Sequence, residues 1–146
     1  MGSRLSVTKE NMHAYVAGFL DADGYITIKV EKSKTCKLGT RARVRVGFAQ
    51  SRSRIFVLEE LFKFIKSGVV SEYQHNNMAE YVINDQKVIF DLLTKIEPFV
   101  IVKSKQLKLA KEFISFKRFG YTKNSLGKMK SLEVKMSKLN SYPKIV

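Results

Sequence analysis

Residues 16–24 of the chain read VAGFLDADG, and this stretch decides the fold. Around and within it, small residues recur every four positions and predict one side of a helix with almost no side chains, formed by Ala14, Gly18 and Ala22. Glycine costs stability inside a helix, so Gly18 indicates that a second helix backbone approaches closely. Two carboxylates, Asp21 and Asp23, precede the final glycine. The stretch therefore predicts close helix packing and negative charge at one point.

Two other interpretations of the same letters are weaker. The order Asp21-x-Asp23-Gly24 imitates the middle of a calcium-binding EF-hand loop, whose first and last ligands would then fall on Phe19 and Val30. Neither side chain can bind a hard cation, so this interpretation fails. The aspartates could also merely end a helix, but the C-terminal end of a helix disfavours anions.

Length and charge limit the class of protein. A chain of 146 residues that is 45% hydrophobic is expected to form one domain with a substantial core. Lys and Arg total 27 against 13 Asp and Glu, and the net charge of +14 favours a nucleic-acid partner. No apolar run is long enough to span a bilayer, so no membrane association is expected.

Further features concern the cellular compartment and the two ends of the chain. The single Cys36 fits a reducing intracellular compartment, either the cytoplasm or an organelle matrix if an organelle encodes the chain. Residues 1–7 are expected to be flexible or to derive from a tag. Residues 121–146 are Lys-rich and predict a loosely packed helix or an arm.

Hydrophobic periodicity predicts helix, hairpin, helix, hairpin and two further helices, hence an α+β fold. The predicted elements are a helix over 9–20 capped by Thr8, strands over 25–31 and 41–48, a helix over 53–66 capped by Ser53, strands over 69–74 and 79–83 joined by a turn over 75–78, a helix up to 96 capped by Asn84 or Asp85, and a helix over about 103–119 that Gly120 ends.

Positive charge is concentrated between residues 29 and 54, where nine basic residues and one acidic residue give a net of +8. Same-face residues of a strand lie ~7 Å apart, so three alternating arginines form a row that would repel itself without an anion. A two-stranded ribbon fits the DNA major groove, where Arg binds guanine with two hydrogen bonds. The predicted DNA-reading surface comprises Tyr25, Thr27, Lys29, Glu31, Arg41, Arg43 and Arg45.

Further DNA contacts are predicted on the second hairpin and in loops. The second hairpin would contribute Ser71, Tyr73, Glu80 and Val82, although alternation alone allows Glu80 and Tyr81 to exchange faces. Contacts mainly to phosphates are predicted for the loop residues Lys32, Lys34 and Lys37, and DNA contacts are also predicted for Ser33 and Lys105.

The nonapeptide, and the element order over roughly residues 12–116, resemble the LAGLIDADG homing endonucleases of the single-motif class. The resemblance implies an αββαββα fold with a curved antiparallel sheet, the saddle, and additional C-terminal helices. It also implies a homodimer through the motif helices, with Ala14, Ala17, Gly18 and Asp21 at the interface. Two departures are Val16 in place of the leading Leu, and Gly47 where a DNA-reading side chain would be useful.

The resemblance also implies site residues and a cofactor. Asp23 would bind a metal by its carboxylate and Ala22 by its backbone carbonyl. Gln50 would position water, while Arg54 and Lys103 would lie near the scissile phosphate. Mg²⁺ is the implied ion, or Mn²⁺, whereas Ca²⁺ is expected to bind without supporting cleavage. His13 and His75 are not expected to act as the base.

The expected function is that of an intron-encoded, site-specific endonuclease. It would hydrolyse both strands of a long, near-palindromic DNA site and leave short 3′ overhangs, with no small-molecule substrate. One alternative is a non-cleaving protein of the same fold, either an RNA maturase or a transcription factor. A general RNA-binding or ribosome-associated domain is a second alternative, which leaves the small residues and paired aspartates unexplained.

Overall fold

A computed structural model describes residues 8–32, 40–118 and 123–141. Two units, each a helix followed by a hairpin, open the chain. The first unit is α1 (Lys9–Asp23), β1 (Gly24–Lys32) and β2 (Thr40–Ser51), and the second is α2 (Ile55–Ile65), β3 (Val69–Tyr73) and β4 (Met78–Ile83). The elements that remain are the helices α3 (Gln86–Ile96), α4 (Ser104–Arg118) and α5 (Lys123–Asn140), and the short 3-10 turns η1 (Arg52–Arg54) and η2 (Glu97–Phe99). This order confirms the predicted α+β fold.

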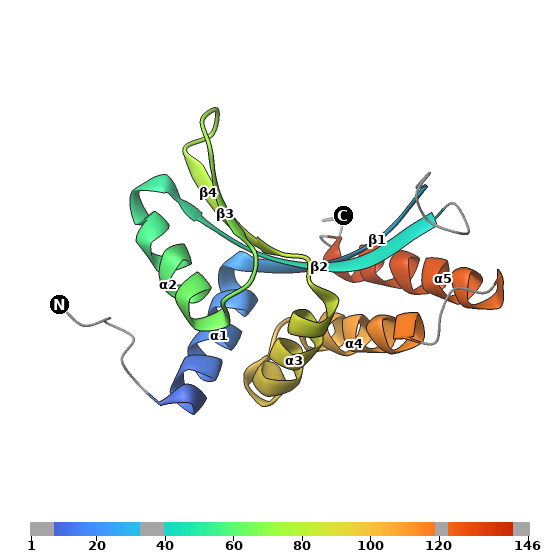
Figure 1. The fold of residues 1–146 in the computed structure, drawn as a ribbon. Coiled ribbons are helices and arrows are strands. Elements are labelled where there is room, and N and C mark those ends of the chain that lie inside the picture. The colour runs from blue at the N-terminus through green and yellow to red at the C-terminus, as the bar shows by residue number, and fades with distance from the viewer. Residues whose placement is uncertain (1–7, 33–39, 119–122, 142–146) are drawn as a thin grey trace, which may run out of the picture.

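The four strands form one antiparallel sheet in the order β1-β2-β4-β3. β2 is the longest strand, with 12 residues, and it joins the two hairpins at the centre of the sheet. Figure 1 shows a curved sheet with the helices on its convex side, so that the concave face is left uncovered by helices. The predicted saddle is therefore present.

Alternation along the strands separates the core from the concave face. On the convex face the side chains of Ile26, Val44, Val46, Phe48 and Tyr81 are fully buried. Each large apolar side chain removed from water in this way stabilises the fold by about 1.5–3 kcal/mol. Because Tyr81 is buried and stacks on Phe48 with ring centroids 5.8 Å apart, Glu80 must face the concave side. Alternation alone did not decide which of Glu80 and Tyr81 faces the concave side, and the burial of Tyr81 assigns that side to Glu80.

The edges of the sheet are covered by side chains from distant helices. On the outer edge of β1, the Val30 amide donates to Glu133 Oε2 at 2.6 Å, and Asn140 Nδ2 donates to the Ile26 carbonyl at 2.9 Å. On β2, beyond the end of β4, the Gln86 side chain exchanges two hydrogen bonds with the backbone of Val44, at 2.9 and 2.8 Å. These bonds satisfy backbone groups that would otherwise be open to another strand.

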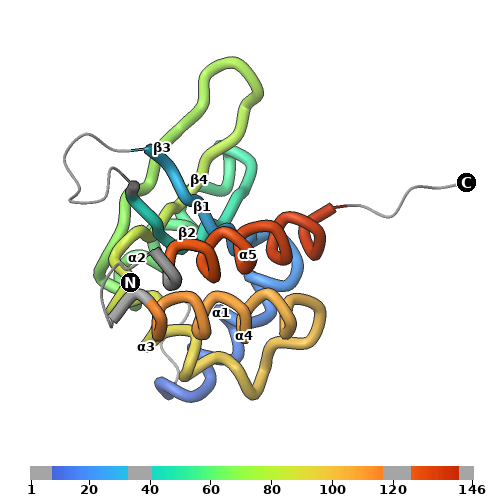
Figure 2. The backbone as a smooth tube through the Cα atoms, turned by 90° about the vertical axis from the view of Figure 1, so that its right-hand side faces the viewer, coloured from blue at the N-terminus to red at the C-terminus, as the bar shows by residue number. Residues whose placement is uncertain are grey.

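The C-terminal helix is more closely packed on the core than the sequence predicts. α5 lies beside α4 (Figures 1 and 2) and buries Met129, Leu132 and Met136. These apolar residues are three and four positions apart, which places them on one core-facing side of the helix. Lysines lie between them in the sequence and make the pattern less evident. The predicted helix is confirmed over residues 123–140, but it packs on the core, so the expectation of loose packing or of an arm is wrong there; the rest of the segment lies outside the described residues or, at Ser141, just after the helix.

Most predicted caps are confirmed. Thr8 accepts a hydrogen bond from the Asn11 amide at 3.2 Å, and Asp85 accepts from the amides of Lys87 and Val88. Asn77 adopts a left-handed φ of 58° in the β3–β4 turn, as expected for asparagine. No helix in the described ranges is long and apolar enough to cross a bilayer.

The start of α2 differs from the prediction. Ser53 does not cap this helix, because residues 52–54 form the 3-10 turn η1 and Arg54 occupies the N-cap position without a side-chain bond. The Ser53 hydroxyl instead lies 3.0 Å from that of Ser51. Gly120, the predicted end of the last long helix, lies outside the described residues.

Candidate active site and nucleic-acid interface

The motif helix α1 runs directly into β1, and Gly24 makes this close junction possible. A Cβ at Gly24 would lie 2.7 Å from the Leu20 side chain and 2.8 Å from its Cα, which is too close for any other residue. The amide of Gly24 donates to the Leu20 carbonyl and closes the last turn. Asp21, Ala22 and Asp23 are therefore held in the last helical turn of α1, directly before β1.

Asp21 fastens the end of α1 to the segment between η2 and α4. Its carboxylate accepts hydrogen bonds from the amides of Ile101 at 2.8 Å and Lys103 at 3.0 Å. In return, Lys103 Nζ donates to the backbone carbonyl of Asp21 at 2.8 Å. Burial raises the pKa of the Asp21 carboxyl, but the backbone donors and the Lys103 charge outweigh burial and the net pKa is lowered. Asp21 is thus a structural tether.

Asp23 is different from Asp21 although only one residue separates them. Its side chain is exposed, and Ala22 beside it is also exposed. Among the described residues, no three His, Cys, Asp or Glu side chains gather closely enough to hold a metal ion. One chain therefore offers an exposed carboxylate and helix-end carbonyls at this position, which are suitable oxygen donors but too few to enclose a hard cation.

The three supporting residues come from separate elements. Gln50 lies near the end of β2, half-buried, and its Oε1 accepts from the Ser51 amide at 2.9 Å. Arg54 is exposed at the start of α2. Lys103 is the one of the three that the structure joins to the motif, through its bond to Asp21. The roles of Gln50 in positioning water and of Arg54 near the scissile phosphate stay predictions.

The exposed side of α1 carries the small residues. Gly18 and Ala22 are exposed, Ala14 is half-buried, and a Cβ built at Gly18 would meet no described atom within 4 Å. Packing within the described part of the chain therefore gives no reason for a glycine at position 18. The prediction of Ala17 as an interface residue is wrong, because Ala17 is fully buried in its own core.

The concave face of β1 and β2 is strongly basic. The register places Lys29 opposite Arg43, Thr27 opposite Arg45 and Glu31 opposite Arg41. Lysine beside arginine is unfavourable without an anion between them. The Nε of Arg43 is buried and has no hydrogen-bond partner among the described residues, which indicates an acceptor outside the chain.

A cluster of two tyrosines and one carboxylate extends this face toward β3. The hydroxyl of Tyr25 donates to Glu80 Oε1, and the hydroxyl of Tyr73 donates to Glu80 Oε2 at 3.0 Å. Burial and the Glu80 carboxyl raise the pKa of Tyr25, and Glu80 raises that of Tyr73. A Cβ at Gly47 would lie 2.2 Å from the Tyr25 ring, so the glycine makes room for the cluster. The absent side chain at Gly47 is thereby explained.

Other predicted contact residues have mixed positions. Ser71 and Lys105 are exposed, and Val82 is half-buried opposite Gly47 on the concave face. Ser33, Lys34 and Lys37 lie outside the described residues. Asn84 was not predicted here, and its Oδ1 accepts from Arg45 Nε at 3.2 Å. Asn84 directly follows β4, and this position in the sequence does not indicate Arg45 as its partner.

Comparison with known proteins identifies the class of protein to which this fold and site belong. The family model described as LAGLIDADG endonuclease matches residues 16–119. The chain belongs to the LAGLIDADG endonuclease family.

Two curated relatives are similar over the same part of the chain. DNA endonuclease I-CreI of Chlamydomonas reinhardtii is 27% identical over 100 residues, which are 68% of this chain and 60% of the relative. DNA endonuclease I-CvuI of Chlorella vulgaris is 30% identical over 101 residues, 69% of this chain and 62% of the relative. The chain therefore spans less than two thirds of each relative in these matches.

Solved structures show the same architecture over more of the chain. The homing endonuclease I-CvuI in complex with its target, in the presence of calcium, has a TM-score of 0.83 and 25% identity, covering 94% of this chain and 87% of the other. The archaeal intron-encoded homing endonuclease I-Vdi141I with DNA has a TM-score of 0.79, covering 95% of this chain and 91% of the other, and at 21% identity it shows the fold alone.

Proposed function

We propose that this protein is a site-specific, metal-dependent DNA endonuclease that acts as a homodimer and hydrolyses both strands of a near-palindromic site. The observation that carries the proposal is the exposed Asp23 at the end of the motif helix, directly before β1, whose concave face with β2 is strongly basic and includes a buried Arg43 Nε without a partner among the described residues. The relatives named above are DNA endonucleases, which supports the same activity.

The dimer follows from the exposed side of α1. Gly18 meets no described atom of its own chain, so a second copy of the helix is the packing partner that gives the glycine a purpose. A two-fold axis there brings the two Asp23 carboxylates together and doubles the oxygen donors at one point. The two concave faces then form one long, symmetric surface suited to a near-palindromic duplex.

A divalent cation fits the donors that the chain presents. Asp23 and the Ala22 carbonyl are hard oxygen ligands at a helix C-terminus, whose partial negative charge favours cations. Bound there, Mg²⁺ or Mn²⁺ would supply charge neutralisation at the phosphate and a lowered pKa for the attacking water. Ca²⁺ is expected to bind without supporting cleavage.

The supporting residues have separate roles in the proposal. Arg54 and Lys103 stabilise the negative charge that develops on the phosphate, and Gln50 orients the attacking water. Lys103 is already placed against the motif by its bond to Asp21. The lone Cys36 remains consistent with a reducing compartment.

The direct test is cleavage of a plasmid library of randomised sites with Mg²⁺. We expect specific double-strand cuts with short 3′ overhangs by the wild type. Asp23→Asn should lower the cleavage rate by at least about a thousandfold and leave binding intact, because metal catalysis contributes several kcal/mol. Glu112→Gln, an exposed carboxyl on α4, is the matched control and should cleave normally.

Two outcomes would contradict the proposal. Specific binding without any cleavage by the wild type would support a non-cleaving protein of this fold, such as an RNA maturase or a transcription factor. A strict monomer in sedimentation with DNA present would exclude a shared site. Gly18→Leu should weaken the dimer while the free chain stays folded, since the added side chain meets open space.

A further inference from the structure

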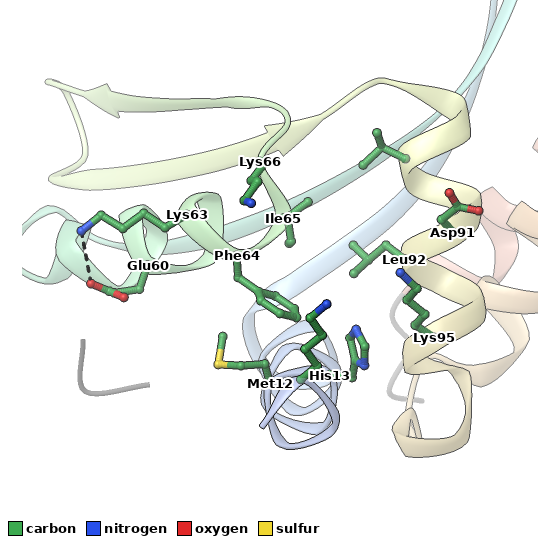
Figure 3. Close-up of a pocket in the computed structure, with 12 residues that line it drawn as sticks. Met12, His13, Glu60, Lys63, Phe64, Ile65, Lys66, Asp91, Leu92 and Lys95 are labelled. Carbon is green, nitrogen blue, oxygen red and sulfur yellow. Dashed lines mark ion pairs between the residues drawn. The ribbon is translucent and has the colours of Figure 1, made fainter. Parts of the chain in front are cut away.

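A cavity of about 620 Å³ lies between α1, α2 and α3, away from the motif aspartates. Figure 3 shows side chains from the three helices surrounding it, among them Met12 and His13 of α1, Phe64 of α2 and Leu92 of α3. At 3.6 residues per turn, Met12 and His13 point away from the exposed Gly18 side of α1. The cavity is therefore separate from both the concave face and the proposed dimer contact, and its size is typical of a small-ligand site.

Positive charge dominates the rim of this cavity. Four lysines line it against two acids, Glu60 and Asp91. Lys63 forms an ion pair with Glu60 at 3.5 Å and turns outward with it (Figure 3). Of the remaining lysines, Lys9 begins α1, Lys66 directly follows α2 and Lys95 lies near the end of α3. An anion in the cavity would therefore meet ammonium groups from several directions.

His13 lines the cavity and feels both burial and the lysine charges. Its pKa is lowered, first by burial and then by the charges of Lys95 and Lys9, against a smaller opposing effect of Glu10. The imidazole is therefore neutral at pH 7 and provides a flat ring rather than a charge. It lies beside the Phe64 ring, with centroids 5.4 Å apart and planes tilted by 59°.

The wall of the cavity is apolar and partly aromatic. Phe64 and His13 stand beside the buried Met12 and Leu92. A ligand that satisfies both parts of the cavity needs a flat apolar group for the rings and a compact negative charge for the lysines. An aromatic base that carries a phosphate has this composition, because bases stack on aromatic side chains and ammonium groups attract phosphate.

We propose that this cavity binds a nucleotide, with its base against Phe64 and its phosphate among Lys9, Lys66 and Lys95. A free nucleotide and one residue of a single strand share this chemistry. The site lies on the convex side of the sheet, so its occupancy does not depend on DNA cleavage at the saddle and the two proposals can fail separately.

The experiment is an NMR titration of the full chain with adenosine 5′-monophosphate, adenosine, inorganic phosphate and a six-residue oligouridylate. With the monophosphate we expect shifts at Phe64 and Lys95 and a rise in the pKa of His13, because a nearby phosphate opposes the lysine charges. Adenosine and phosphate alone should each bind at least about tenfold more weakly, because each lacks one half of the contacts. Tighter binding of the oligouridylate would identify a strand as the source, and equal or weaker binding a free nucleotide.

Variants separate this site from general basic charge. Lys95→Gln should weaken the monophosphate about fivefold, the size of one unit-charge contact in water. Phe64→Leu should weaken it at least about fivefold through lost stacking, and Phe64→Tyr, which keeps the ring, should restore binding. The control Lys108→Gln on α4 removes an equal charge elsewhere and should have no effect.

Three results would overturn the proposal. Shifts confined to the concave face, with affinity lost in Arg43→Ala, would place the nucleotide on the saddle. Inorganic phosphate binding as tightly as the monophosphate would show that no base is recognised. Equal affinity in wild type and Lys95→Gln would remove the cavity from the interaction.

Discussion

The two helix–hairpin units share one backbone order but present different chemistry to the concave face. In the first unit, β1 and β2 direct lysine and arginine outward, with Lys29 opposite Arg43. In the second unit, β3 and β4 direct Ser71, Tyr73, Glu80 and Val82 outward. In the proposed DNA complex, the first hairpin would supply attraction to phosphates, and the second would supply an oriented hydrogen-bond acceptor. Under this proposal, affinity and selectivity for DNA would come from separate halves of one sheet.

The helices of the two units also end differently. α1 ends in Asp21 and Asp23, and Asp21 binds the chain before α4. α2 ends at Ile65; the next residue, Lys66, is left-handed with φ of 65°, and the chain then passes through Gly68 with φ of 107°. A Cβ at Gly68 would lie 2.4 Å from the Val82 carbonyl. Both helices are thus followed by a closely packed glycine, Gly24 or Gly68, but the end of α1 is also tied by the Asp21 carboxylate to the chain before α4.

The largest expected effect comes from removing the arginines of the first hairpin. The triple change of Arg41, Arg43 and Arg45 to Ala should weaken binding to every duplex by at least about a hundredfold at low salt. Each lost phosphate contact reduces the slope of log affinity against log salt by ~0.9, so the slope should fall by up to about 2.7. Fluorescence anisotropy over a salt series measures both quantities.

A matched control tests whether position or total charge matters. Changing Lys130, Lys135 and Lys138 of α5 to Ala removes the same charge from exposed positions on a helix on the convex side. We expect a small, uniform loss of affinity. A fall in slope equal to that of the arginine variant would contradict the assignment of attraction to the first hairpin.

The next largest effect should come from Glu80 in the second hairpin. A carboxylate held by two tyrosine hydroxyls can accept a hydrogen bond from the amino group of cytosine in the major groove. Glu80→Gln should therefore reduce cytosine preference at one base pair about tenfold, within the ~1–3 kcal/mol of such a contact. Selection of bound sites from a randomised library gives the preference.

Glu72 provides the control for that variant. It lies on the opposite face of β3, across from buried Ala79, and pairs with Arg52 at 3.4 Å. Glu72→Gln changes the same charge and should leave base preference unaltered. If both variants change preference equally, the second hairpin contributes only its charge.

A smaller effect is expected at Gly47, where the two hairpins meet. A methyl group there would force the Tyr25 ring away from Glu80, and Gly47→Ala should lower the free energy of unfolding by about 1–2 kcal/mol. In a Tyr25→Leu background the same change should cost less, because the clash is already removed. Urea unfolding measures the difference.

Gly127 of α5 is the matched glycine. A Cβ there meets no described atom within 4 Å, so Gly127→Ala should stabilise the protein by about 0.5–1 kcal/mol. A loss at Gly127 as large as that at Gly47 would mean that the close contact with Tyr25 is not the cause.

The smallest effect concerns Asp21 and depends on pH. Its lowered pKa in the folded state means that it stabilises the fold above its ordinary value of 3.8 and that this contribution is lost as the pH falls through the folded value. Asp21→Asn should lower the free energy of unfolding by about 1 kcal/mol at pH 7, and the difference should vanish in acid. Chemical unfolding at a series of pH values checks this, and a gap that persists in strong acid, where the Asp21 carboxyl is protonated in both the folded and the unfolded state, would contradict the tether.

Much of this protein follows from local sequence. The spacing of apolar residues placed α1, both hairpins and α3, and the caps at Thr8 and Asp85 are where short-range hydrogen bonding puts them. Alternation along β2 also assigned the arginines to one face, because successive side chains of any strand point to opposite faces of the sheet. The motif of residues 16–24 was sufficient to identify the family.

Contacts between residues far apart in the chain were decided only by the tertiary structure. The bond of Asp21 to Lys103, the pairing of Glu133 with β1 and the face of Glu80 all depend on how elements separated by tens of residues meet. The burial of Ala17 and the space that Gly47 leaves for Tyr25 are of the same kind. Helix and strand patterns record which side of an element is apolar, whereas the partner on that side is set by packing of the whole chain.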